Sequence, residues 1–156
     1  MGGTEYNQVE MKILIPGIPQ PKQSARFRAV KGRNGQTFVQ SYQTKAVKDM
    51  EANIGYEIRS QLPPDWIPYD GPISVRVIFV FPPLKSFSKG KLERLKGGEL
   101  MYKSTKPDLT DNLMKGLFDA MNGIVFRDDA QVCEVYSRKI YGMRPYTEIE
   151  FEIAEP

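Results

Sequence analysis

The sequence contains no histidine and only one cysteine among its 156 residues. The absence of histidine excludes serine–histidine and cysteine–histidine catalysis and histidine-ligated zinc. The single cysteine, Cys133, excludes an internal disulfide and a multi-cysteine metal cluster, and we expect it to lie in the core. Any enzymatic chemistry must therefore come from carboxylates, amines, hydroxyls, amides or a bound ion. Hard cations that prefer oxygen ligands, such as magnesium, lead that list.

Long hydrophobic runs are also missing. No apolar stretch approaches the ~20 residues that a membrane-spanning helix needs, and the start lacks the basic-then-apolar pattern of a signal peptide. We therefore expect a cytoplasmic protein. The length suffices for one hydrophobic core and is too short for two ordinary domains. The sequence thus predicts a single domain over residues 1–156.

Several long stretches of the chain carry charges that are mainly or entirely of one sign. Between Met11 and Lys48 there are eight basic residues and no acidic residue, and residues 85–106 hold seven basic residues against two glutamates. Residues 107–129 hold five aspartates against one lysine and one arginine, and four glutamates without a base follow Tyr146. Segregated positive charge is what a phosphate-binding surface requires. The alternative is a solvated surface on which the charges mix again in three dimensions.

Hydrophobic periodicity predicts an α+β fold. We expect helices over residues 41–62 and from Asp108 to Met121, and strands over residues 9–15, 26–30, 36–40, 73–81, 124–126, 132–140 and 146–153. Two pairs of these strands are expected to form hairpins, 26–30 with 36–40 and 132–140 with 146–153. Residues 86–98 fit either a short helix or a mobile segment. This order favours a two-layer sandwich in which helices pack on one mixed or antiparallel sheet.

Acidic residues cluster around the start of the second helix. Residues 106–115 read KPDLTDNLMK, so Asp108, Asp111 and Lys115 project from adjacent turns of one helix edge. From Asp111 to its end the helix rises about 15 Å, and the extended run that follows covers about 16 Å. If that run returns beside the helix, Asp129 lies level with Asp111. Three converging aspartates repel one another unless they share a cation, and their oxygens are the ligands that magnesium prefers.

Each of these residues also has a structural interpretation. Asp108 is able to cap the helix, Lys115 to pair with Asp111, and Asp128-Asp129 to form a polar turn. Asp119 lies at mid-helix and is more simply explained as a cap for a neighbouring backbone group. Acids and an amine with convergent geometry nevertheless favour a functional site when they are taken together.

These segments resemble the RusA family of Holliday junction resolvases, which is common in bacteria and their prophages. The resemblance rests on residues 106–115, on LFDAMNG at 117–123 and on DDAQ at 128–131, with a weaker similarity at residues 16–28. It implies a small two-layer α/β homodimer that cuts four-way DNA junctions using magnesium, with manganese as a substitute. By position, it implies that Asp108, Asp111 and Asp129 are metal-binding carboxylates and that Lys115 is the catalytic amine. In the family's usual pattern one residue separates the first two aspartates, whereas this sequence has Leu109-Thr110 there.

The predicted reaction is metal-assisted hydrolysis of a phosphodiester, with Lys115 neutralising the developing negative charge or orienting the attacking water. A homodimer with two-fold symmetry presents two such sites to a junction that is itself roughly two-fold symmetric. The substrate is branched double-stranded DNA, and we expect the first basic stretch to hold its phosphates. The residues expected to do so are Lys22, Arg26, Arg28, Lys31 and Arg33.

Two alternatives remain open. Pro107-Asp108 is also compatible with the first half of a restriction-type PD…(D/E)xK motif, but neither Asp128-Asp-Ala nor Glu134-Val-Tyr places a lysine two residues after an acid. The other alternative is a non-catalytic nucleic-acid-binding module, in which the basic hairpin binds phosphates and the aspartates only cap a helix. Adding magnesium and looking for nicked DNA separates this module from an enzyme.

Overall fold

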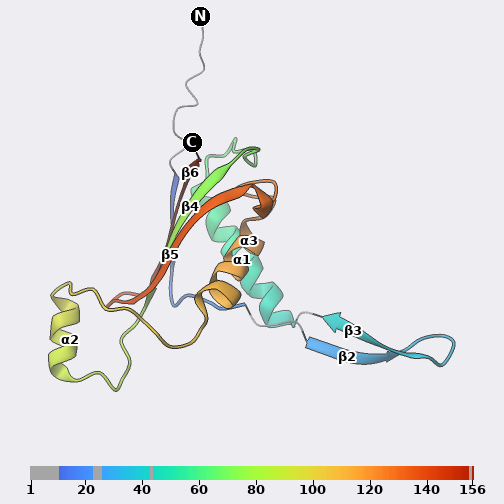
Figure 1. The fold of residues 1–156 in the computed structure, drawn as a ribbon, viewed down its shortest axis with the longest axis horizontal. Helices are drawn as coiled ribbons and strands as arrows, with labels where there is room; N and C mark the ends of the chain where they lie inside the picture. Colours follow the sequence, from blue (N-terminus) through green and yellow to red (C-terminus); the bar gives the residue numbers. More distant parts are fainter. Residues whose placement is uncertain (1–10, 23–25, 43, 155) are drawn as a thin grey trace, which may run out of the picture.

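The computed structural model describes residues 11–22, 26–42, 44–154 and 156. A four-stranded sheet carries helices on one face, and a separate two-stranded hairpin stands away from it (Figure 1). The strands are β1 (Met11–Pro16), β2 (Arg26–Lys31), β3 (Thr37–Tyr42), β4 (Ile73–Phe81), β5 (Val132–Tyr141) and β6 (Tyr146–Ile153). The helices are α1 (Lys45–Gln61), α2 (Lys89–Lys96) and α3 (Lys115–Met121), with a π-helical turn η1 (Leu109–Met114) and a 3-10 turn η2 (Asp129–Gln131). The predicted α+β class is confirmed.

The sheet is mixed, and its strand order is β1-β6-β4-β5. β6 runs antiparallel to both β1 and β4, whereas β5 runs parallel to β4. The prediction that 132–140 and 146–153 pair with each other is therefore wrong, although both strands form. The apolar strand β4 lies between them because a strand buried along most of its length needs a neighbour on each side.

The connection from β5 to β6 crosses the end of β4 at Gly142. The backbone N–H of Gly142 donates to the carbonyl of Phe81 at 2.9 Å. A Cβ atom at this position would lie 2.6 Å from Cγ1 of Val80, which is closer than side chains pack. The absence of a side chain therefore allows this short crossing.

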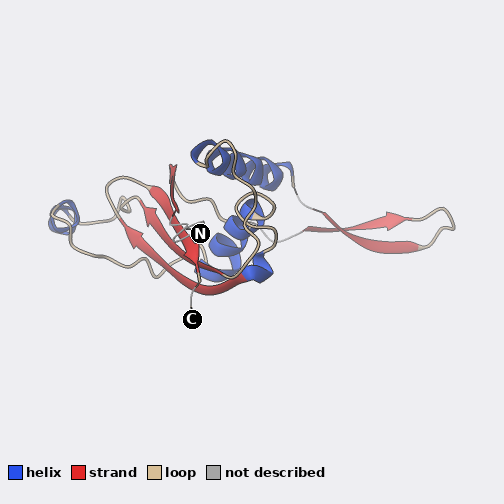
Figure 2. Ribbon diagram, turned by 90° about the horizontal axis from the view of Figure 1, so that it is seen from above, coloured by secondary structure: helices blue, strands red, loops and turns tan. Residues whose placement is uncertain are grey.

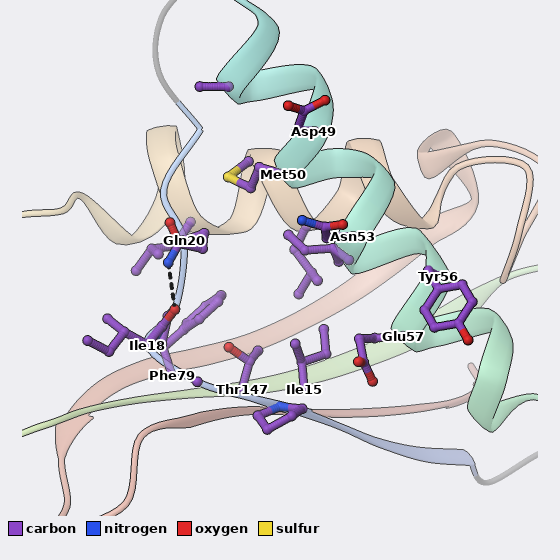
Figure 3. A pocket seen from close by; sticks show the side chains of 17 residues that line it. Ile15, Ile18, Gln20, Asp49, Met50, Asn53, Tyr56, Glu57, Phe79 and Thr147 are labelled. Carbon is purple, nitrogen blue, oxygen red and sulfur yellow. Dashed lines mark hydrogen bonds between the residues drawn. The ribbon is translucent and has the colours of Figure 1, made fainter.

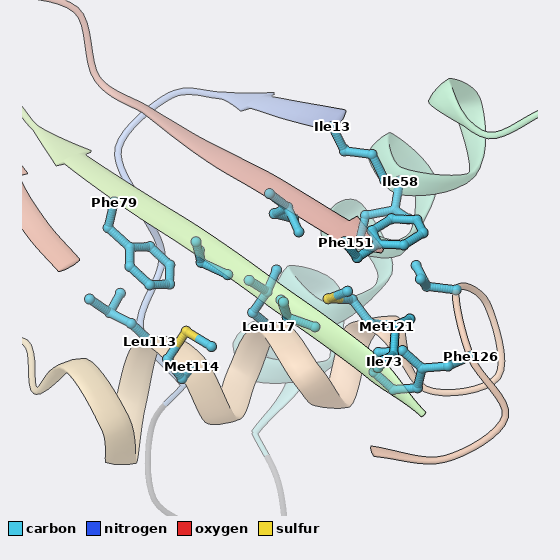
Figure 4. Close-up of a cluster of buried hydrophobic side chains, with 14 of the residues drawn as sticks. Ile13, Ile58, Ile73, Phe79, Leu113, Met114, Leu117, Met121, Phe126 and Phe151 are labelled. Carbon is cyan, nitrogen blue, oxygen red and sulfur yellow. The ribbon is translucent and has the colours of Figure 1, made fainter. Parts of the chain in front are cut away.

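The core lies between the sheet and the helices α1 and α3 (Figure 4). Alternate residues of β4 face the helices, as the period-two pattern predicts. The largest fully buried side chains of the core include Ile13, Ile58, Ile73, Leu113, Met121, Phe126, Ile149 and Phe151. Helix α1 begins later than predicted, because Tyr42 still pairs with β2 and Thr44 supplies the N-cap by accepting a hydrogen bond from the Val47 N–H at 3.4 Å. In the described part of the chain, no helix is both long and apolar enough to cross a membrane.

Two local predictions are wrong. Residues 124–126 do not form a strand but part of a tight turn, in which Gly123 has φ +75° and its N–H donates to the Phe126 carbonyl at 2.8 Å. Val125 and Phe126 are apolar because the turn buries them completely, which a short apolar run does not distinguish from a strand. Cys133 is exposed rather than buried, because β5 is an edge strand of the sheet.

The basic hairpin of β2 and β3 forms as predicted. Its strands pair from Arg26 opposite Tyr42 to Lys31 opposite Thr37, and Gly35 takes a positive φ of 75° at the tip. Figure 2 shows it projecting from the body of the molecule, and every side chain of β3 is exposed. The hairpin therefore adds nothing to the core and leaves its basic side chains accessible.

Candidate active site

The helix that carries the predicted acids begins with a wide turn. In η1 the N–H of Leu113 donates to the carbonyl of Asp108 at 3.1 Å, five residues back, where an α-helix would reach only four. This turn holds the additional residue between Asp108 and Asp111. The Asp108 side chain makes no capping hydrogen bond, so the simple capping role is not what this carboxylate does. Isolated π turns of this kind occur frequently at functional sites.

Asp111, Lys115 and Asp119 follow one another at four-residue intervals along the helix. Asp111 and Lys115 are both exposed. Within the described part of the chain, no carboxylate oxygen lies within 4.0 Å of the Lys115 ammonium, so Lys115 does not form the structural ion pair with Asp111. Its positive charge is therefore available to a bound anion.

Asp129 lies near Lys115 and Asp119 although it belongs to η2, which follows the end of α3 along the chain. The 3-10 turn η2 is capped by Asp128, whose carboxylate accepts the Ala130 N–H at 3.4 Å, while Gln131 bonds back to the Asp128 N–H at 2.8 Å. Asp128 therefore has a structural role, whereas Asp129 lines a hollow of about 360 Å³ together with Lys115 and Asp119. The other lining residues are Thr110, Met114, Phe118, Val135 and Ser137.

The carboxyl of Asp129 has a raised pKa. The first cause is a hydrogen bond with the Asp128 carboxyl, followed by partial burial and by the negative charges of Asp128 and Asp119. The carboxylates of Asp128 and Asp119 thus oppose the ionisation of Asp129. Asp108 and Asp111 do not line this hollow, so the structure brings Lys115 and Asp129 together but leaves the other two predicted acids at the start of the helix.

Lys22 occupies a different setting from the one predicted. Its ammonium pairs with Glu51 at 2.8 Å and with Asp119, and only 12% of its side chain is exposed. Burial alone would lower the pKa of Lys22, but hydrogen bonds with Asp119 and Glu51 raise it. Two carboxylates already neutralise this lysine, so its ammonium is less available to an anion than the exposed cations of the hairpin.

The backbone around Lys22 explains how it reaches Asp119. The N–H of Lys22 donates to the Asn112 carbonyl at 3.1 Å, and the Asn112 side chain donates back to the Lys22 carbonyl at 2.9 Å. One turn later, a Cβ at Gly116 would lie 3.0 Å from the Lys22 Cβ. Asn112, Gly116 and Asp119 therefore form one docking face for this segment, and their i, i+4, i+7 spacing is the sequence pattern that identifies it.

A second lysine, Lys139 of β5, holds the loop that precedes Asp108. Its ammonium donates to the carbonyls of Thr105 and Pro107, both at 2.7 Å. Burial and the nearby charge of Lys103 lower the pKa of Lys139, and the negative charge of Asp108 opposes that shift. Sequence reasoning missed Lys139 because its partners are backbone carbonyls, which leave no trace in the residue pattern.

The hairpin presents three of the expected DNA-binding residues on its surface. Arg28, Lys31 and Arg33 are exposed. Arg28 is oriented by a hydrogen bond to Gln40 at 3.3 Å and by the ring of Tyr42, whose centroid lies 5.1 Å from the guanidinium carbon. The Arg26 side chain lies outside the described part of the structure.

The residues present fit a magnesium ion that is shared with a phosphate. Among the described residues, no three acidic or cysteine side chains gather closely enough to form a metal cage of their own. Magnesium, however, is usually held by one or two carboxylates, with waters and substrate phosphates completing its shell. The negative charges of Asp128 and Asp119 raise the pKa of Asp129, and a cation bound beside Asp129 would oppose that effect.

A larger cavity, of about 530 Å³, lies apart from these acids between α1 and the end of β1 (Figure 3). Ile15, Met50 and Ile54 contribute to its apolar lining, and Asp49 and Glu57 of α1 are its acidic residues. It contains none of the predicted site residues. The candidate site is therefore the smaller hollow beside α3.

Comparison with known proteins gives two findings. The uncharacterized protein YqaN of Bacillus subtilis (strain 168) is 37% identical over 93 residues, which are 59% of this chain and 64% of that protein. The chain thus spans less than two thirds of that relative's length. A family model described as "Endodeoxyribonuclease RusA" matches residues 16–152. Because this match covers most of the chain, including the acids, Lys115 and the hairpin, the protein belongs to the RusA endodeoxyribonuclease family.

Proposed function

We propose that this protein is a metal-dependent, structure-selective endonuclease that resolves four-way DNA junctions by paired phosphodiester hydrolysis. The observation that carries the proposal is the shared hollow of Lys115 and Asp129, in which the ammonium has no carboxylate partner among the described residues. Membership of the RusA endodeoxyribonuclease family supports the same activity.

The residues of the site have separate roles in this proposal. Asp129 in the hollow, and Asp108 and Asp111 at the helix start, would supply carboxylates to magnesium, which would provide a water of lowered pKa and positive charge at the scissile phosphate. Lys115 donates to a phosphate oxygen as negative charge develops in the transition state. Lys22 neutralises Asp119, so that this carboxylate does not repel the phosphate from the hollow. Lys139 fixes the carbonyls that precede Asp108.

The hairpin supplies affinity for the junction arms. Arg28, Lys31 and Arg33 stand on an element that is exposed on all sides and makes no contribution to the core. Cations of this kind bind phosphates by releasing condensed counterions, so affinity falls steeply as salt rises.

A homodimer completes the proposal, because two sites related by two-fold symmetry nick opposed strands of one junction. The edge strand β5 supports this arrangement, since Tyr136 exposes 48% of its surface there, whereas the neighbouring Val135 lines the hollow. Unprotected apolar edge strands are a common place for chains to associate.

The test replaces single carboxylates by amides. Asp129→Asn and Asp111→Asn should each lower cleavage of a synthetic four-way junction in magnesium by at least about 100-fold, because each change removes a charged ligand of the proposed magnesium ion. Junction binding in metal-free buffer should change by less than about threefold, since neither residue is a phosphate-binding cation. Asp65→Asn, which changes an exposed carboxylate just after α1, is the matched control and should cleave normally.

Full cleavage by both variants would refute the proposal. Binding of junctions without any nicking by the unaltered protein, in either magnesium or manganese, would favour a non-catalytic nucleic-acid-binding module. In that case the aspartates would contribute only to the helix start and the turn.

A further inference from the structure

A second basic element lies far from the hairpin. After β4 the chain leaves the sheet, forms α2, and returns where Tyr102 bridges to Ile140 of β5. Both views place α2 and the β2–β3 hairpin at opposite ends of the molecule, with α3 between them (Figures 1 and 2). None of the residues assigned to catalysis or to the hairpin lies on α2.

Few contacts hold α2 in place. An isolated helix of eight residues is too short to be stable in water, so its position depends on anchors. Leu95 is buried, the Ser88 hydroxyl accepts the Lys91 N–H at 3.2 Å, and Phe87 packs edge-on against Tyr141 with ring centroids 4.9 Å apart. The helix therefore buries one narrow stripe and exposes the rest of its surface.

That exposed surface is strongly basic. Residues 85–96 contain five basic residues and one acidic residue, Glu93. In the described part of the chain, no carboxylate oxygen lies within 4.0 Å of the Lys85 or Lys89 ammonium. Two pairs do form, Lys96 with Glu93 at 3.6 Å and Arg94 with Glu99 at 3.7 Å, but all four side chains are about half exposed or more. Such pairs are weak and exchange readily for a stronger anion.

We propose that α2 and the preceding Lys85 form a second phosphate-binding site, which holds the backbone of a DNA arm other than the arm held by the hairpin. The inference rests on the proposed nuclease function and adds to it a substrate-binding element at the opposite end of the protein. Charged residues that only contact water do not need a segment that extends away from the sheet. A surface that contacts a second DNA arm does need such a segment, and α2 provides one. The chain returns from α2 to the sheet at Tyr102 and then enters the loop that Lys139 holds before Asp108.

The experiment compares two double variants with equal loss of charge. Lys85→Gln/Lys89→Gln removes two unpaired cations from the α2 end, and Lys12→Gln/Arg59→Gln removes two exposed cations from β1 and α1. Junction dissociation constants are measured in metal-free buffer from about 50 to 200 mM salt, a range over which affinity depends strongly on the number of phosphate contacts. Thermal melts verify that both variants remain folded.

The α2 variant should lower the slope of log affinity against log salt by up to about 2, because each lost phosphate contact removes about 0.9. The control variant should leave the slope within about 0.3 of the original, since it removes no contact. Glu93→Gln, which adds net positive charge to α2, should tighten binding. An unchanged slope in the α2 variant, or an equal change in the control, would overturn the proposal.

Cleavage separates this proposal from the nuclease proposal. At saturating junction, the α2 variant should cleave within about twofold of the unaltered protein, because its substitutions change binding and not the reacting groups. If the unaltered protein binds junctions but never cleaves them, the nuclease proposal fails while the binding measurements still decide the role of α2.

Discussion

Replacing Lys139 by methionine removes the ammonium that holds the loop before Asp108. That ammonium donates to the carbonyls of Thr105 and Pro107, each at 2.7 Å. A hydrogen bond from a charged donor contributes about 1.5–3 kcal/mol. One of these bonds is exposed, and the charge of Lys103 opposes that of Lys139. We therefore expect the free energy of unfolding to fall by about 2 kcal/mol, well below the sum for two fully buried bonds.

Two measurements check this expectation. In urea denaturation, a loss of that size should lower the midpoint by about 1 M for a domain of this length. In single-turnover cleavage of a four-way junction, the rate should fall by at least about 10-fold, because Asp108, a proposed magnesium ligand, loses its fixed position. Junction affinity in metal-free buffer should stay within about twofold, since the Lys139 ammonium is already engaged by the carbonyls of Thr105 and Pro107.

Lys139→Arg is the matched control, because it keeps the positive charge and several N–H donors. It should retain most of the stability and most of the cleavage. A methionine variant with the original midpoint and the original rate would refute the reasoning about the loop. A methionine variant that loses stability but cleaves normally would show that the loop does not position Asp108.

Two further predictions concern the charges around the hollow. The pKa of Asp129 is raised in the folded protein, so this carboxyl contributes its full stability below its unfolded pKa and loses that contribution as pH rises through its folded pKa. Asp129→Asn should therefore raise the melting temperature at neutral pH, with no gain at acid pH. Scanning fluorimetry across pH measures this difference, and magnesium should stabilise the original protein but not the variant. Lys22→Met leaves Asp119 and Glu51 facing each other without a cation and should cost about 1–3 kcal/mol in urea denaturation, less than for a fully buried pair. Adding Asp119→Asn should restore part of that loss, and no restoration would contradict the ion-pair argument.

Local patterns predicted most elements of this fold. The alternation along residues 73–81 and the helical stripe ending near Leu62 correspond to β4 and α1. The pairing of the last two strands was not predictable in the same way, because β4 inserts between them from more than fifty residues earlier in the chain. Alternation specifies which face of a strand is buried but not which strand lies beside it.

The candidate site was predictable in part. The turn at Asn122-Gly123 correctly implied that the chain reverses after the helix and brings Asp129 back toward it. Val125 and Phe126 are buried in a tight turn and do not extend along the helix as a strand. Asp129 therefore lies beside Lys115 and Asp119 and not beside Asp111. The pairing of Lys22 with Asp119 joins residues 97 positions apart, and nothing in either local sequence specifies it.

The wide turn at residues 109–114 also bears on how the helix accommodates an additional residue. An α-helix that gains a residue rotates everything before the insertion by about 100° relative to everything after it. Here the gain is confined to a single turn, so Gly116 and Asp119 keep their alignment with Lys22. An additional residue before Asp111 therefore changes the position of Asp108 and leaves the contacts of Lys22 with the rest of the helix in place.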